Sequence, residues 1–228
     1  MKCVILQPSY IPWRGYFHQI YKADIFVFYD DVQYDKHGWR NRNRIKTPNG
    51  SHWLTIPVLT KGLLTNGTPI NQVCIDWKDN WARKHWSTIK LNYGKAPYFL
   101  KYEPIIEKYY NNHPKSLSDF TIELTMALAK EIGIEKTRFV RSSSLHAKGK
   151  KTERLLSILQ QLDVTHYISG PSAKDYLDED MLRSAEISIE YMEYKYPEYR
   201  QLYPPFDPNV SILDLLFMAG PQASQYIW

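Results

Sequence analysis

Short apolar runs alternate with helical patterns at the start of the chain. Residues 2–6 and 25–29 each contain an apolar run of the length expected for a buried strand. Between them, apolar side chains recur at helical spacing from residue 16 to residue 23, after a loop made rigid by Pro8 and Pro12. This order predicts a βαβ unit, in which parallel strands are joined by a right-handed crossover.

A second strand-helix-strand pattern follows in the C-terminal half. The apolar pair at residues 139–140 predicts a strand, residues 151–162 an amphipathic helix, and residues 166–169 another strand. Residues 187–191 alternate apolar and polar side chains, which is typical of a half-buried strand. Together the two units predict an α/β fold with a mainly parallel sheet flanked by helices.

The middle of the chain has a different pattern. Strands are expected at residues 51–58 and 72–76, separated by a loop at 62–67. Three helices are predicted at 80–92, 98–111 and 116–132, the third capped by Ser116 or Ser118. A final helix at 211–218 begins at Ser211. We therefore expect a single α/β domain over residues 1–228, with a helical insertion at about 80–135.

Composition narrows the class of protein. Of the 228 residues, 43% are apolar, enough for a real core, and the two cysteines are too few for a disulfide framework. No run approaches the ~18 apolar residues of a spanning helix, so we expect a cytoplasmic protein without a membrane partner. The net charge of +5 suits an anionic substrate, and 18 Tyr and 7 Trp suit a pocket for bases and sugars.

The loop after the first strand is the first candidate site. Loops at the carboxyl ends of parallel strands line ligand crevices, and a helix that begins near Gly15 would present free amides to a phosphate. In this loop Gln7, Tyr10 and Tyr16 could orient a ligand, with Trp13 as a stacking wall. The alternative is a rigid loop that merely covers the core.

The loop predicted at residues 30–46 carries most of the charge. Asp30 and Asp31 follow a buried strand, where carboxylates could bind Mg²⁺ or accept hydrogen bonds from sugar hydroxyls. Arg42 could bind phosphate or carboxylate with its guanidinium fork. The alternative is a solvated basic face. The other substrate-binding candidates here are Gln33, Tyr34, Trp39, Asn41, Asn43 and Lys46.

A third candidate site follows the strand at 166–169. Gly170 would let the backbone approach a ligand, although a tight turn in which Ser172 caps the next helix is an equal alternative. His18, on the first helix, could act as a general acid or base, but it could equally be an ordinary surface histidine. The substrate-binding candidates in this third loop are Ser169, Gly170, Ser172, Asp175 and Tyr176.

Several of these segments form a long motif set. It runs through Gln7-Pro-x-Tyr-x-Pro-Trp-x-Gly-Tyr-Phe17, residues 30–34, residues 41–46, Tyr167-x-Ser-Gly-Pro-Ser172 and residues 208–216. This set resembles the WbqC-like family. The resemblance implies a place in the synthesis of O-antigen and other surface polysaccharides. It further implies a transferase or ligase that moves an acyl or aminoacyl group onto an amino-sugar nucleotide.

The opening of the chain is also similar to adenylyl-transferring enzymes with a His-x-Gly-His motif, although Trp13 and Tyr16 stand at the two histidine positions. That similarity implies ATP and Mg²⁺ as cofactors. Arg42 and Lys46 would then stabilise phosphate charge, and Asp30 or Asp31 would hold Mg²⁺ or accept the amine proton. His18 could assist.

Two functions other than a transferase or ligase remain possible interpretations of the sequence. One is a nucleotidyltransferase, which would use the same phosphate-binding groups without forming an amide. The other is a noncatalytic module that binds nucleic acid through its basic and aromatic surface. The lack of a known binding motif counts against the second alternative, so we expect a small-molecule substrate, a nucleotide sugar, and no nucleic-acid partner.

Overall fold

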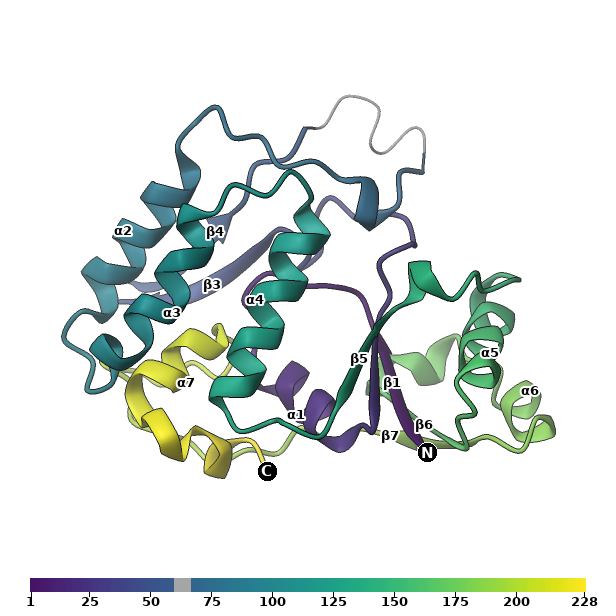
Figure 1. Cartoon of the computed structure of the whole chain (residues 1–228). Coiled ribbons are helices and arrows are strands. Elements are labelled where there is room, and N and C mark those ends of the chain that lie inside the picture. Colours follow the sequence, from purple (N-terminus) through teal and green to yellow (C-terminus); the bar gives the residue numbers. More distant parts are fainter. Residues whose placement is uncertain (60–66) are drawn as a thin grey trace.

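The computed structural model describes residues 1–59 and 67–228. In these residues a five-stranded sheet, parallel throughout, has the strand order β5-β2-β1-β6-β7 and confirms the predicted α/β fold (Figure 1). The loop expected at 62–67 lies outside the described residues, apart from Gly67. The strands are β1 (Lys2–Leu6), β2 (Ile25–Phe28), β5 (Arg138–Arg141), β6 (His166–Ser169) and β7 (Ser188–Tyr191).

Strand β1 is buried on both of its faces. Val4 faces one hydrophobic cluster, which contains Phe17 of helix α1 (Arg14–Lys22). Its neighbour Cys3 faces a second cluster, which contains Ile158 of helix α5 (Lys151–Gln161). Successive side chains of a strand point to opposite faces, so α1 and α5 cover opposite sides of the sheet. Helix α6 (Glu179–Ser184) adds Leu182 to the second cluster.

The order of the strands creates a switch point next to β1. The chain passes from β1 through α1 to β2 on one side, and returns from β5 through α5 to β6 on the other. The connections therefore diverge from the carboxyl ends of β1 and β6. In open parallel sheets, ligands bind where the strand order reverses in this way.

The predicted helical insertion is confirmed by helices α2 (Trp81–Tyr93), α3 (Phe99–Asn111) and α4 (Leu117–Glu131). They lie side by side, and α3 also packs against α7 (Ile212–Ala219) (Figure 1). The predicted caps are present as well. The Ser116 hydroxyl accepts the Asp119 amide at 3.2 Å, and Ser211 accepts the Leu213 amide at 3.2 Å.

Two predictions for the middle of the chain differ from the structure. The strand expected at 72–76 is wrong: Ile70–Gln72 forms a 3-10 turn, and Cys74 and Ile75 each make only a single bridge, to Ser116 and Val58. Because the two residues bridge different segments, no ladder develops.

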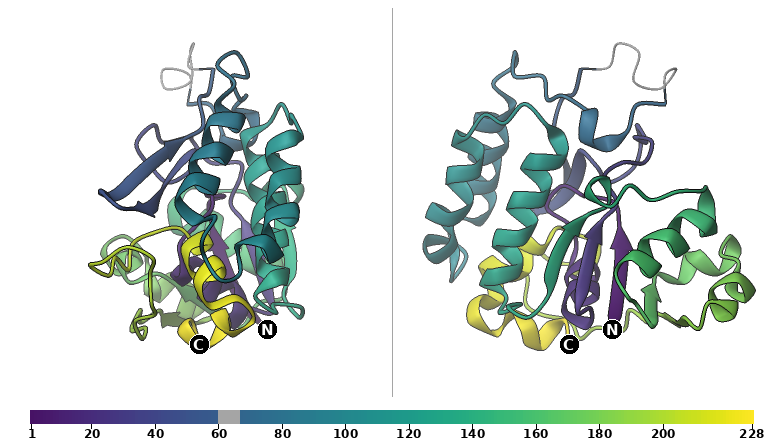
Figure 2. Two further views of the ribbon diagram at one scale, coloured as in Figure 1. Left: turned by 90° about the vertical axis from the view of Figure 1, so that its left-hand side faces the viewer. Right: turned by 45° about the vertical axis from the view of Figure 1, so that its right-hand side comes forward.

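The loop expected at 30–46 contains a strand. Residues Arg42–Thr47 form β3, which pairs antiparallel with β4 (Gly50–Thr55) in a separate hairpin. Figure 2 shows this dark blue hairpin standing out from the helices. Over its first four residues the strand alternates: Asn43 and Ile45 are buried, while Arg42 and Arg44 are partly exposed.

The helices in the described residues all fall short of the length and apolar character that a membrane span requires.

Helix α2 is tied to the first loop by a buried histidine. The Nδ1 atom of His85 lies 2.9 Å from the hydroxyl of Tyr10, which in turn lies 2.5 Å from the hydroxyl of Tyr110 on α3. Burial lowers the pKa of His85 to about 4. The imidazole is therefore neutral in the folded protein at pH values where it is charged in the unfolded chain.

This shift predicts a loss of stability in acid. The folded pKa lies below the unfolded value, so the contribution of neutral His85 is present above pH ~6.5 and disappears toward pH ~4. At ~1.36 kcal/mol per pH unit it amounts to about 3 kcal/mol. The variant His85→Gln should flatten the pH dependence of the unfolding free energy over this interval, measured by urea titration. An unchanged pH dependence in His85→Gln would contradict the assignment.

Candidate functional site

A cavity of about 1080 Å³ lies at the switch point of the sheet. Its walls include Leu6 and Gln7, where β1 ends, and Ser169 and Gly170, where β6 ends. Helices α1 and α5 border it from the two sides of the sheet, through residues such as Gln19 and Leu155. Its size fits a ligand with several linked groups.

The loop after β1 places an indole over the start of α1. An added Cβ on Gly15 would lie 2.3 Å from the Trp13 ring, so glycine is the residue that lets this ring fold back. Trp13 also packs edge-on against Tyr194, with ring centroids 5.0 Å apart. The Tyr16 hydroxyl donates to the Gln7 carbonyl at 3.0 Å and fixes the loop against α1. Trp13, Tyr16 and Gln7 therefore form one preorganised wall.

The hairpin strand β3 and the residues before it supply a second wall. Asn43 is buried, and its Nδ2 donates to the carbonyls of Tyr10 at 3.1 Å and Ile11 at 2.9 Å. This contact ties the hairpin to the first loop. Arg40 and Arg44, on either side of this anchor, line the cavity. Burial lowers the pKa of the Arg40 guanidinium from its ordinary value, while Asp35, 3.4 Å from Nε, opposes the shift.

The segment after β6 and the start of α5 complete the cavity. Ser172 and Asp175 are exposed at its edge on a 3-10 turn formed by Pro171–Asp175, and the exposed Tyr176 directly follows that turn. Lys151 contributes a further cation from the first residue of α5. Among the described lining residues, Asp175 is the only carboxylate, set against the cations Arg40, Arg44 and Lys151. The cavity therefore favours an anionic ligand.

The structure brings ten of the predicted site residues together at this cavity. They come from all three segments that the sequence singled out. The ten are Gln7, Trp13, Tyr16, Trp39, Asn43, Ser169, Gly170, Ser172, Asp175 and Tyr176.

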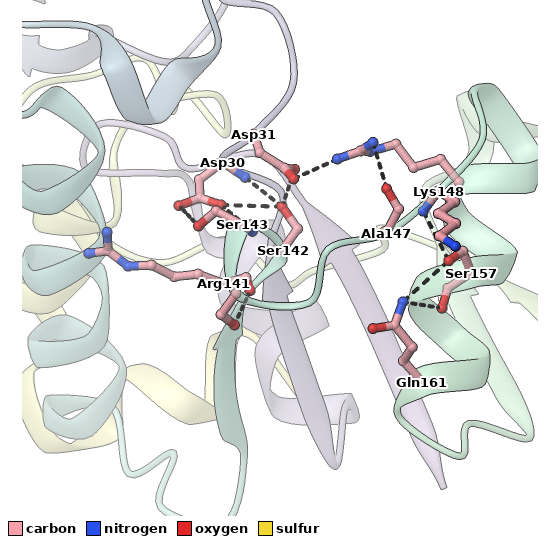
Figure 3. A network of polar contacts seen from close by, with 11 residues as sticks. Asp30, Asp31, Arg141, Ser142, Ser143, Ala147, Lys148, Ser157 and Gln161 are labelled. Atoms are coloured by element: carbon pink, nitrogen blue, oxygen red, sulfur yellow. Dashed lines mark hydrogen bonds and ion pairs between the residues drawn. The ribbon is translucent and has the colours of Figure 1, made fainter.

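The predicted carboxylates lie in a network at the end of β2 (Figure 3). Asp30 is fully buried and accepts hydrogen bonds from the Ser143 amide at 3.0 Å and the Ser143 hydroxyl at 3.0 Å. Asp31 pairs with Arg154 of α5 at 2.5 Å and accepts from the Ser142 hydroxyl at 2.5 Å. Both carboxylates thus hold the 142–150 segment, the loop that leads to Lys151.

His18, on α1, lies outside the cavity lining. Its Nδ1 is 2.9 Å from the Tyr196 hydroxyl. Burial lowers the pKa of His18, Lys22 lowers it further, and Glu190 opposes both. His18 thus joins α1 to the segment after β7.

Arg42 lies outside the cavity lining. Its guanidinium stacks 4.7 Å above the ring of Trp53, and it donates to the His37 carbonyl. Arg44 stacks on the same ring at 5.5 Å but also borders the cavity. The alternation of β3 places both arginines on one face of the strand, where they share Trp53, but the cavity lining includes Arg44 and not Arg42.

The remaining predicted residues serve the core or the surface. Tyr10 is buried beside His85, and Asn41 donates to the Ile56 carbonyl at 2.8 Å. Lys46 donates through Nζ to the Pro205 carbonyl. Tyr34 is buried, whereas Gln33 is exposed and bridges Pro69.

Several residues at the cavity were missed by sequence reasoning. Gln19 follows Tyr16 by three positions on α1, so helical spacing places both on one face. Arg40 and Arg44 lie within the candidate segment at residues 30–46, but the sequence does not distinguish them from the other basic residues there. Other missed polar or aromatic lining residues are Ser9, Tyr29, Lys151, Tyr167 and Asn209.

Metal ligands do not gather at any point in the part of the chain that the structure describes: no three His, Cys, Asp or Glu side chains come together there as a metal-binding group.

The profile of the WbqC-like protein family matches residues 7–226, from the first loop of the cavity to the last turn of the chain. The chain belongs to this family. It is also similar to an uncharacterized protein of Mycobacterium tuberculosis, Rv1507c, with 41% identity over 228 residues, 99% of this chain and 97% of the relative. No solved structure matches the chain. Membership of the WbqC-like family suggests a role in polysaccharide biosynthesis.

The Trp13 wall provides a test of the site's packing. Gly15→Ala should displace the indole and lower the free energy of unfolding by about 1–3 kcal/mol, the usual effect of overpacking, although alanine favours helices. The matched variant Gly170→Ala places its Cβ 3.5 Å from the Tyr194 hydroxyl, an ordinary contact, and should be nearly neutral. Chemical denaturation measures both. A stabilised Gly15→Ala protein would show that the ring does not occupy this position.

Proposed function

We propose that this member of the WbqC-like family is a transferase or ligase of surface-polysaccharide biosynthesis. It binds a nucleotide sugar in the cavity at the switch point and forms an amide on the amine of that sugar. The observation that carries this proposal is the pairing of cations with aromatic walls around one cavity: Arg40, Arg44 and Lys151 beside Trp13 and Trp39.

The two halves of such a ligand need different surroundings. The linked phosphates are anionic, and guanidinium groups bind phosphate oxygens through paired hydrogen bonds. A base or a sugar presents a flat or apolar face, which an exposed indole such as Trp39 can cover. The cavity offers both kinds of contact from neighbouring residues, because Trp39 directly precedes Arg40.

The proposed reaction is acyl or aminoacyl transfer. The amine nitrogen attacks the carbonyl carbon of an activated acyl donor, a C–N bond forms, and the bond from that carbon to its leaving group breaks. The leaving group departs with the electron pair, and the amine loses a proton. Asp175 is the carboxylate that the described lining offers to accept this proton.

The geometry changes the roles that we assign to the other predicted residues. We now assign phosphate binding to Arg40, Arg44 and Lys151, because these residues line the cavity. They replace Arg42 and Lys46 in this role. Asp30 and Asp31 act as positioning residues, because their hydrogen bonds hold the segment that ends at Lys151.

ATP with Mg²⁺ stays a prediction for the activation of the acyl group. The described residues lack a cluster of three protein ligands for a metal, but Mg²⁺ in nucleotide sites keeps phosphate oxygens and waters as most of its ligands.

A thermal-shift panel tests the proposal. It contains nucleotide sugars, free nucleotides, ATP and CTP with Mg²⁺, and acyl thioesters. A ligand that binds only the folded protein raises its stability by about 2.7 kcal/mol at one hundred times its Kd. At least one nucleotide sugar should therefore raise the melting temperature. The proposal fails if no nucleotide or nucleotide sugar does so. Binding only to oligonucleotides, with steep salt dependence, would favour the nucleic-acid module instead.

The two stacked arginines provide a matched pair of variants. Arg44→Ala should weaken nucleotide-sugar binding at least tenfold, because Arg44 borders the cavity. Arg42→Ala removes a guanidinium from the same tryptophan ring and should change the affinity less than threefold. Isothermal titration calorimetry measures both. If Arg42→Ala has the larger effect, the phosphates bind beside Arg42, outside the cavity lining.

A further inference from the structure

Gln19 has an unusual environment for an amide on a helix. Its side chain is buried, with 4% of the residue exposed, and it borders the cavity. Its Oε1 atom is shielded and accepts a hydrogen bond from none of the described residues. A buried acceptor that no donor meets destabilises the folded protein, so such an atom beside a cavity needs an explanation.

Two other polar side chains at the cavity already have partners. The Tyr16 hydroxyl, one helical turn before Gln19, donates to the Gln7 carbonyl at 3.0 Å. Asn43, the buried amide on the hairpin wall, donates to the Tyr10 and Ile11 carbonyls, and its Oδ1 accepts the Arg44 amide at 2.8 Å. Of these three cavity residues, Gln19 is the one whose side-chain oxygen accepts a hydrogen bond from none of the described residues.

We propose that Gln19 is a specificity-determining residue that accepts a hydrogen bond from the amine of the bound sugar. This inference rests on the proposed function and adds to it the orientation of the substrate. The anionic end of the ligand lies against Arg40 and Arg44, and the hydrogen-bond donor of the sugar ring points to α1.

The chemistry of the amide fits an amine that has to react. A neutral carbonyl oxygen accepts an N–H without adding negative charge beside the nitrogen. A carboxylate at the same position would favour the ammonium form, which has no lone pair with which to attack an acyl carbon. A glutamine therefore selects the amine while leaving it nucleophilic.

A first experiment uses the ligand-free protein. The variant Gln19→Met keeps the length of the side chain and removes the unpartnered oxygen, so its melting temperature should equal or exceed that of the wild type. The control Asn43→Leu removes an amide that is fully bonded, and its melting temperature should fall. If Gln19→Met falls as far as Asn43→Leu, Gln19 is a structural residue and the proposal is overturned.

A second experiment measures discrimination by calorimetry. The probes are UDP- or dTDP-linked 4-amino-4,6-dideoxyglucose, the analogue with hydrogen in place of the amine, and the free nucleotide diphosphate. The wild type should bind the amino sugar at least tenfold more tightly than the analogue. In Gln19→Met this ratio should fall below about twofold, with the affinity for the free diphosphate unchanged.

The outcomes separate the two proposals. If the diphosphate binds but Gln19→Met keeps the wild-type ratio, the role of Gln19 is overturned and the nucleotide site stands. If neither sugar nucleotide nor the diphosphate binds, both proposals are overturned together.

Discussion

The position of β1 at the centre of the parallel sheet is the constraint on which the rest depends. Its residues Cys3 to Ile5 are at most 5% exposed, because helices cover both faces and strands pair with both edges. The carboxyl end of β1, at Leu6, opens on the cavity. The chain must leave this end in one direction while the connection from β6 leaves in the other, and the cavity lies between them.

Polar side chains hold the loops around this opening. Asn43 bonds the carbonyls of the first loop, Tyr16 bonds Gln7, and Asp30 bonds the Ser143 amide and hydroxyl. The backbone N–H and C=O groups of a loop have no hydrogen-bond partners within a helix or a strand. Each of these groups that is buried therefore needs a hydrogen-bond partner elsewhere. Residue types typical of active sites are therefore used here to position the backbone. This use explains why the first loop and the hairpin form rigid walls.

Local patterns predicted the sheet and the helices, because apolar periodicity is a property of consecutive residues. Apolar periodicity did not predict β3, because the buried residues Asn43 and Ile45 alternate with arginines and one of the two is itself polar. Access to the cavity was only partly predictable. Tyr10 and Tyr16 both follow β1, yet Tyr10 bonds His85 in the core, through a helix 75 residues away in sequence. Contacts of that range leave no signal in one sequence.

One wall of the cavity is positively charged, and the wall formed by α1 offers a neutral group. The hairpin side carries Arg40 and Arg44, whose field attracts an anion before it makes contact. The side of α1 offers Gln19, an uncharged acceptor. A carboxylate there would cancel part of the positive field and would hold a nearby amine as an ammonium ion. The neutral amide avoids both effects, at the cost of a buried oxygen that none of the described residues bonds. The two hydrophobic clusters on either side of the sheet provide the stability that lets the fold keep such a group.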